Sequence, residues 1–354
     1  MTQPCALIMA GGTGGHIFPG IAVALALREK GWRVHWLGSP DSMESRLVPA
    51  RGFALETVQF GGVRGKGLGT LLRAPLRLLR AVWQSRAVLR RVRPDVVLGL
   101  GGYITMPGGI ASKLMGVPLV LHEQNSIAGL SNRLLAKVAD RIFTAFPKVL
   151  PKGQWVGNPL RPEFFSQRDP LERFAGRSGP LRLLVVGGSL GASALNRTVP
   201  QALALLAEEQ RPLVLHQSGE KQIEELRANY AAAGVQATLT PFIQDTAHAF
   251  AEADLVLCRA GASTVTEIAA VGAAALFVPF PFAVDDHQTH NARFLVDQGA
   301  AWLLPQSAMS PEKLAATLRQ LQRADLVQLA VAAKRTQQLQ ATEQVVAACQ
   351  EYLA

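Results

Sequence analysis

The chain carries one glycine-rich turn twice, about half its length apart. The first turn lies in LIMAGGTGGH (residues 7–16) and the second in LLVVGGSLGA (residues 183–192). In each, glycines permit a sharp backbone turn after an apolar run, and a segment of helical periodicity follows (17–30 and 194–206). Free backbone N–H groups beside the positive end of a helix dipole bind phosphate. His16 adds a group next to the first turn that can accept a proton.

Parallel β-sheets would position these turns, because apolar runs alternate with helical segments through the whole sequence. We expect strands at residues 7–10, 33–37, 55–58, 96–99, 119–121, 183–186, 213–216, 237–239, 255–258 and 275–278. The second half repeats the first: DVVLGLGG (95–102) and VPLVLH (117–122) correspond in order to DLVLCRAG (254–261) and AALFVP (274–279). The pattern predicts an α/β fold of two Rossmann-like, parallel-sheet domains facing a cleft.

The length of 354 residues fits two domains of ordinary size. Residues 145–180 are rich in proline, glycine and charge, so we place the linker there. The expected domains are residues 1–160 and residues 161–340. The last helix, 341–354, could pack on either of them.

Several classes of protein are disfavoured by the sequence. Ile17 stands where a dinucleotide fingerprint needs its third glycine, and Gly67 follows Lys66 where a P-loop needs Ser or Thr. The three cysteines are widely spaced, which fits neither a disulfide framework nor a zinc site. No apolar run reaches the roughly 18 residues of a membrane span, and no signal peptide is evident, so we expect a cytoplasmic protein.

Six motifs in one order closely resemble those of the MurG family of bacterial glycosyltransferases. They are MAGGTGGHIFP (9–19), GGY (101–103), HEQN (122–125), GNPLR (157–161), GGSLGA (187–192) and RAGASTVTE (259–267). The resemblance covers residues 6 to about 300. It implies a GT-B fold, with the acceptor in the N-terminal domain and UDP-GlcNAc in the C-terminal domain.

The resemblance also implies the residues that bind the donor. Ser189 and the backbone around it would bind the diphosphate together with Arg161, whose planar guanidinium suits that group. Leu190 replaces a glutamine that is frequent in relatives, so a side-chain bond is not expected there. Glu267 would accept both ribose hydroxyls, and Ile243 would read the uracil through its backbone. The nucleotide and sugar would be lined by Ala262, Ser263, Thr264, Val265, Thr266 and Gln288.

Two residues compete for the role of general base. His16 begins a helix, where the dipole favours the neutral imidazole that a base requires, and it could instead contact an acceptor phosphate beside Thr13, Gly14 and Gly15. Glu123 ends a buried strand next to Asn125, which resembles a residue that contacts the GlcNAc hydroxyls. The sequence leaves both candidates open. No metal is expected to be required, since Arg161 and a helix dipole can neutralise the departing diphosphate, although Mg²⁺ could stimulate the reaction.

The net charge of +10 is concentrated in one segment. Between Glu56 and Asp95 there is no acidic residue, and the basic residues are Arg64, Lys66, Arg73, Arg77, Arg80, Arg86, Arg90, Arg91 and Arg93. On a helical wheel, Leu72, Leu76, Leu79 and Trp83 form a second apolar stripe beside the one that would face a core, next to Arg73, Arg77 and Arg80. Pro75 would begin the second of two helices. The pattern is typical of a helix on an anionic membrane surface; an ordinary buried helix is the alternative, and no nucleic-acid-binding fold accompanies the charge.

The expected function is therefore inverting transfer of GlcNAc from UDP-GlcNAc to undecaprenyl-pyrophosphoryl-MurNAc-pentapeptide, at the cytoplasmic face of the inner membrane. A UDP-GlcNAc epimerase or a GT-B transferase with another acceptor would share the donor half. A noncatalytic nucleotide-sugar-binding membrane protein is the alternative outside enzymes.

Overall fold

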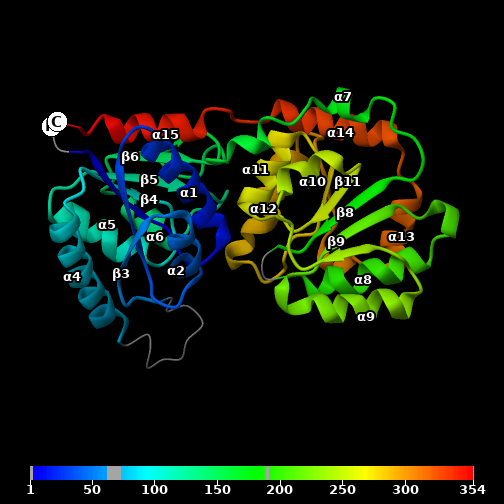
Figure 1. The fold of residues 1–354 in the computed structure, drawn as a ribbon, viewed down its shortest axis with the longest axis horizontal. Coiled ribbons are helices and arrows are strands. Elements are labelled where there is room, and N and C mark those ends of the chain that lie inside the picture. Colours follow the sequence, from blue (N-terminus) through cyan, green and yellow to red (C-terminus); the bar gives the residue numbers. More distant parts are fainter. Residues whose placement is uncertain (1–2, 62–72, 189–190, 354) are drawn as a thin grey trace. The chain divides into compact units, whose positions relative to one another are not determined.

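The protein divides into two compact units in a computed structural model that describes residues 3–61, 73–188 and 191–353. The first unit is Met1–Arg161 together with Gln340–Ala354, and the second is Pro162–Leu339. Each unit is an α/β structure with a parallel sheet between helices (Figure 1).

The first unit is built on a seven-stranded sheet in the order β3-β2-β1-β4-β5-β6-β7. Its strands are β1 (Cys5–Met9), β2 (Arg33–Gly38), β3 (Ala54–Thr57), β4 (Val96–Gly99), β5 (Leu119–Glu123), β6 (Arg141–Thr144) and β7 (Gln154–Trp155). Its helices are α1 (Gly14–Glu29), α2 (Met43–Leu47), α4 (Ala74–Val92), α5 (Thr105–Leu114), α6 (Leu130–Leu135) and α15 (Ala341–Gln350).

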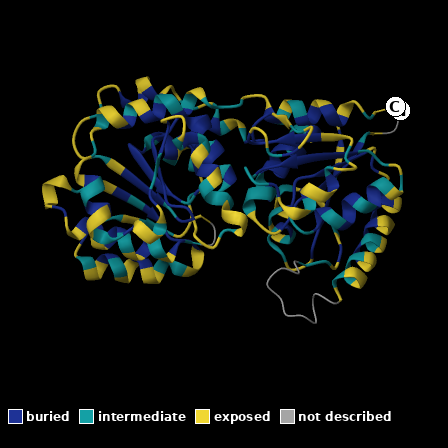
Figure 2. Ribbon diagram, turned by 180° about the vertical axis from the view of Figure 1, so that it is seen from behind, coloured by how far each residue is buried: buried dark blue, intermediate teal, exposed yellow. Residues whose placement is uncertain are grey.

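Strand β1 is buried on both faces, which explains its unbroken apolar sequence. Because successive side chains of a strand point to opposite faces, Ala6 and Ile8 pack in the cluster that contains α1 and α15. Leu7 and Met9 pack in the cluster that contains α4 and α5. Figure 2 shows the strands as buried and the outer sides of the helices as exposed.

The second unit has a six-stranded sheet in the order β10-β9-β8-β11-β12-β13. Its strands are β8 (Arg182–Val186), β9 (Leu213–Gln217), β10 (Thr238–Thr240), β11 (Leu255–Cys258), β12 (Ala275–Phe277) and β13 (Trp302–Leu303). Its helices are α7 (Pro170–Phe174), α8 (Ser193–Ala204), α9 (Ile223–Ala233), α10 (Thr246–Glu252), α11 (Ala262–Val271), α12 (His287–Val296), α13 (Pro311–Arg319) and α14 (Arg323–Arg335).

The internal repeat includes one hydrogen bond that occurs at the equivalent place in both sheets. Asp95 precedes β4 and accepts the backbone N–H of Cys5 in β1 at 2.7 Å. Asp254 precedes β11 and accepts that of Arg182 in β8 at 2.9 Å. In both sheets the strand order reverses at this pair of strands, and ligands of open α/β sheets bind at the carboxyl side of such a reversal.

The ten strands expected from the sequence are all present and parallel. The sequence missed β6, β7 and β13. The assignment of residues 145–180 to a linker is wrong in extent, because β7 belongs to the first sheet, α7 packs in the second unit, and the chain passes between units at Arg161 and Pro162. Pro75 lies in the first turn of α4, as expected, whereas the helix proposed before it falls outside the described residues.

Candidate functional site

The carboxyl edge of the first sheet gathers residues from β1, β4 and β5. Thr13 is the N-cap of α1, Gly14 and Gly15 begin that helix, and His16 completes its first turn. The Thr13 hydroxyl lies 3.3 Å from Nδ1 of His16. A Cβ added at Gly101, after β4, would lie 3.0 Å from Cδ2 of His16, so the imidazole lies against that glycine.

Glu123, at the end of β5, is 2% exposed and its carboxylate is fully used. Oε1 accepts the backbone N–H of Asn125 at 2.9 Å and its side-chain amide at 3.3 Å. Oε2 accepts the N–H of Gly129 at 3.1 Å and the Asn132 amide at 2.9 Å. A carboxylate has about four lone-pair positions, so these bonds occupy all of them. Glu123 therefore fixes the loop that carries Asn125.

The neighbouring His122 is buried on the other side of β5 and supports the same loop. Its Nε2 donates to the carbonyl of Gly157 at 2.9 Å, and its Nδ1 accepts from the Gln124 amide at 2.9 Å. Burial lowers the pKa of His122 to about 4, despite the bond to Gly157. The ring is therefore neutral at physiological pH, and it links Gln124 to the carbonyl of Gly157 through hydrogen bonds.

Two arginines lie near each other in the first unit. Arg161 is half-buried, and burial followed by the charge of Arg161 lowers the pKa of Arg51. Arg51 also lies over the ring of Phe18, in α1. Arg51 is thus a second cationic group within electrostatic range of Arg161, and it is a further candidate for binding phosphate. Sequence reasoning missed Arg51 because it lies in no recognised motif.

The second glycine turn is held by its neighbours in the second unit. Gly191 has φ +78°, and a Cβ there would overlap the carbonyl of Ser218 and the side chain of Gln222, so only glycine fits. Gln222 accepts the Asn196 amide at 2.8 Å and the Ser193 hydroxyl at 3.1 Å. These contacts hold Gly191 and the first turn of α8 in place. Ser189, expected at the diphosphate, lies outside the described residues.

Helix α11 begins at the expected nucleotide-binding motif, and Gly261 is its N-cap. Ala262, Ser263 and Thr264 form its first turn, whose backbone N–H groups and helix dipole favour an anion or a hydroxyl oxygen. Val265 and Thr266 are buried, and the Thr266 hydroxyl donates within the helix to the carbonyls of Ala262 and Ser263 at 3.0 and 2.9 Å. These two side chains therefore support the helix.

Glu267 is half-buried one turn along α11 and is close enough to raise the pKa of Cys258, after the larger effect of burial. Gln288, in the first turn of α12, accepts the backbone N–H groups of Ala260 at 3.2 Å and Phe280 at 2.9 Å. Its carbonyl oxygen is thereby used, and its amide nitrogen is the group that could bind a ligand. Ile243 lies between β10 and α10, on the same carboxyl edge of the sheet.

Comparison with known proteins gives one consistent answer. Residues 6–144 match the glycosyltransferase family 28 N-terminal domain, and residues 182–348 match the C-terminal domain of the same family. The chain is similar to a protein of Paracidovorax citrulli, with 68% identity over 100% of both chains. That protein is named UDP-N-acetylglucosamine--N-acetylmuramyl-(pentapeptide) pyrophosphoryl-undecaprenol N-acetylglucosamine transferase. A protein of the same name from Albidiferax ferrireducens is 69% identical, over 99% of this chain and 92% of that one.

The chain belongs to the MurG enzymes of glycosyltransferase family 28. A crystal structure of Acinetobacter baumannii MurG is similar over 98% of this chain and 99% of that one, with a TM-score of 0.85 and 42% identity. The calicheamicin glycosyltransferase CalG4 is 16% identical with a TM-score of 0.70, over 100% of this chain and 99% of that one, which shows a shared fold. The family and the GT-B fold expected from the motifs are thus confirmed.

In this glycosyltransferase, α4 exposes one apolar face. Leu76, Leu79 and Trp83 are 70%, 66% and 74% exposed, while Val88 and Leu89 are buried. The second apolar stripe predicted from the sequence is therefore on the surface, apart from Leu72, which lies outside the described residues. Among the flanking residues, Arg73 and Arg80 are exposed and Arg77 is half-exposed.

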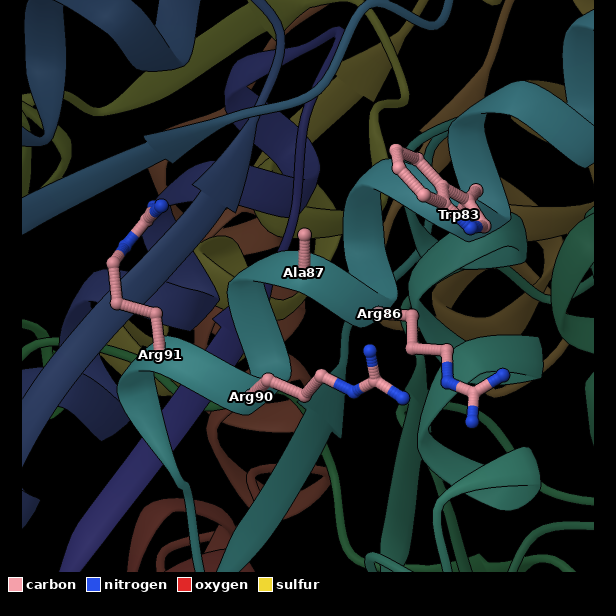
Figure 3. A pocket seen from close by; sticks show the side chains of 5 residues that line it. All are labelled: Trp83, Arg86, Ala87, Arg90 and Arg91. Atoms are coloured by element: carbon pink, nitrogen blue, oxygen red, sulfur yellow. The ribbon is translucent and has the colours of Figure 1, made fainter.

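Beside this face lies a hollow of about 400 Å³, lined by Trp83, Arg86, Ala87, Arg90 and Arg91. Figure 3 shows Arg86 and Arg90 extending to the same side of α4, whereas Arg91 points elsewhere and pairs with Glu56. Along the described chain, no helix is long and apolar enough to span a bilayer. The described residues likewise contain no cluster of three or more His, Cys, Asp or Glu side chains placed to hold a metal.

Proposed function

We propose that this protein transfers N-acetylglucosamine from UDP-GlcNAc to the 4-hydroxyl of the muramyl sugar in undecaprenyl-pyrophosphoryl-MurNAc-pentapeptide, the lipid I to lipid II step of peptidoglycan synthesis. The observation that carries the proposal is 68% identity, over the whole of both chains, to a transferase named for this reaction. The six motifs that resemble the family add to it.

Each sheet edge would bind one substrate. In the second unit, the turn at residues 187–191, Ile243, the first turn of α11, Glu267 and the amide nitrogen of Gln288 would bind UDP-GlcNAc. A carboxylate such as Glu267 can accept both ribose hydroxyls in charge-assisted bonds. In the first unit, the edge around His16 and Asn125 would receive the acceptor. Arg161 would meet the diphosphate that departs.

We assign proton transfer to His16. The muramyl 4-oxygen attacks C1 of GlcNAc, the bond between C1 and the UDP oxygen breaks, and the hydroxyl proton passes to the imidazole. Inversion at C1 gives a β1,4 link. Glu123 would have to break one of its four hydrogen bonds to take the proton, so we assign it to holding Asn125.

The test is release of UDP with and without the lipid-linked acceptor. Release that depends on the muramyl acceptor supports the proposal. Release without it, epimerised product, or UDP-GlcNAc binding without turnover would support the alternative functions instead.

His16→Ala should lower kcat by about 10²-fold or more with little change in UDP-GlcNAc affinity, because the base acts on the acceptor hydroxyl. The exposed His248 supplies the control, His248→Ala, which should keep wild-type turnover. Near-normal kcat in His16→Ala would remove His16 from the mechanism and return the role to Glu123.

We propose that no metal is required, since Arg161 and the first-turn amides can compensate the charge of UDP. Equal turnover in EDTA and in Mg²⁺ would support this. A rise with Mg²⁺ above an active EDTA baseline would indicate stimulation, and complete loss in EDTA would refute the proposal.

We further propose that α4 docks on the anionic surface of the cytoplasmic face of the inner membrane. Leu76, Leu79 and Trp83 would enter the interface, and nearby arginines would each contribute about 1 kcal/mol.

Replacing Arg73, Arg77 and Arg80 by Glu should abolish sedimentation with anionic vesicles and leave UDP binding intact. Replacing the exposed Arg227, Arg319 and Arg335 of the second unit gives the same charge change as a control. Vesicle binding that survives the first triple substitution, or that is lost equally in the control, would refute the assignment to α4.

A further inference from the structure

Gln217 is a buried side chain that joins the carboxyl ends of three neighbouring strands. It ends β9 and is 3% exposed. Its Oε1 accepts the backbone N–H of Gly188 at 3.1 Å, and its Nε2 donates to the carbonyl of Gly188 at 3.1 Å. The same Nε2 donates to the carbonyl of Pro241 at 3.0 Å. One amide thus bonds both backbone groups of Gly188, the second residue after β8, and also binds Pro241, directly after β10.

The two segments that Gln217 connects are the ones expected to bind different parts of a nucleotide. Gly188 lies in the glycine turn, and Pro241 lies two residues before Ile243. The backbone bond from Ser218 N–H to the Thr240 carbonyl, at 3.0 Å, joins β9 and β10 just beside this point. Gln217 therefore sets the distance between Gly188 and Pro241, at the start of the loop at residues 241–243.

In the first unit, a carboxylate and not an amide accepts the backbone N–H of the equivalent glycine. There the N–H of Gly12, the second glycine of its turn, is accepted by Oε2 of Glu44 at 3.2 Å, and Oε1 of Glu44 accepts from Ser39. Glu44 is fully buried. A carboxylate has no donor and would repel a phosphate above it. The neutral amide of Gln217 accepts the equivalent N–H, that of Gly188, without a negative charge. Its nitrogen donates to the carbonyls of Gly188 and Pro241.

We infer that Gln217 is a positioning residue that sets the spacing between the diphosphate turn and the base-binding loop, and thereby makes the second unit selective for ligands that carry both a uridine and a diphosphate. The inference rests on the proposed function, because it takes UDP-GlcNAc as the ligand of this unit. Gln217 acts through its hydrogen bonds to the backbone of Gly188 and of Pro241, and it needs no contact with the ligand itself.

Two substitutions separate shape from hydrogen bonding. Gln217→Leu removes all three bonds and puts an apolar side chain of similar size at the same buried position. Gln217→Glu keeps an acceptor for Gly188 N–H but places an oxygen against two carbonyls and a carboxylate beneath the turn, as in the first unit. Gln210→Leu, at an exposed position of the same unit, is the control. Thermal unfolding would check that each variant is folded.

The experiment compares the inhibition constants of UDP and uridine, together with KM and kcat for UDP-GlcNAc. We expect both Gln217 variants to lose tenfold or more in UDP affinity, with less than threefold change for uridine, a raised KM and a kcat within threefold of wild type. We expect Gln217→Glu to show the larger loss because it adds a charge near the diphosphate.

Equal changes for UDP and uridine, or none beyond the control, would overturn the inference while leaving the transferase assignment intact. A wild-type protein that binds neither UDP nor UDP-GlcNAc would overturn the proposed function, and this inference with it.

Discussion

Gly101 offers a way to move His16 without removing it. Gly101 has φ +96°, a region in which a residue with a side chain is strained by about 1–3 kcal/mol. A Cβ there would lie 3.0 Å from Cδ2 and 3.1 Å from Nε2 of His16, and 3.4 Å from the Asn132 amide. Ordinary carbon contacts are longer, so in Gly101→Ala the imidazole must shift by a few tenths of an ångström.

Gly116→Ala is the matched control. Gly116 lies in the same unit with φ +70°, and a Cβ there would have no atom within 4 Å. Both variants should lower the melting temperature, by about 2–4 °C for each kcal/mol of strain in a unit of this size. Only Gly101→Ala also disturbs His16.

The assay is turnover with saturating donor and lipid-linked acceptor. A misplacement of about 1 Å can cost 10²-fold in rate, so we expect roughly a tenfold lower kcat for Gly101→Ala and wild-type kcat for Gly116→Ala. UDP affinity should be unchanged in both, because its expected ligands lie in other segments. If the two variants have the same kcat, the reasoning that places His16 at the reacting hydroxyl is refuted.

Two further predictions concern stability. The guanidinium of the buried Arg173 donates to carbonyls at the ends of α10 and α11, and burial, with the charge of Arg177, lowers its pKa to about 10, so it remains charged. Arg173→Met should therefore cost about 3 kcal/mol in urea unfolding, and a loss below about 1 kcal/mol would argue against this role. Burial also holds the pKa of His122 at about 4 and that of His216 at about 3, whereas unfolded histidine takes up its proton near 6.5. The unfolded state then binds more protons, so each unit should lose about 1 kcal/mol per pH unit as pH falls from 6.5 to 5. Unfolding free energies that stay constant over this range would contradict the burial of both rings.

The type of fold and the segments expected to carry the site follow from local patterns in the sequence. A central parallel strand is buried on both faces, so its own residues form an apolar run, and the glycine turn after it is required locally by the backbone. Both signals are local, and ten strands and both turns could be predicted from them. The occurrence of Asp95 and Asp254 before corresponding strands could also be recognised in the sequence.

Other features depend on contacts between segments that are distant in the chain. Strands β7 and β13 have two residues each and carry no periodic signal; their pairing depends on neighbours in the sheet. The four donors to Glu123, three in the loop that follows β5 and one from Asn132 in α6, have no signature in the local sequence. Helix α15 packs on α1 although the entire second unit separates them in the chain. Gln217 reaches Gly188 and Pro241 only because β8, β9 and β10 lie side by side, and lateral strand order arises from contacts between distant segments, which no local pattern of residues records.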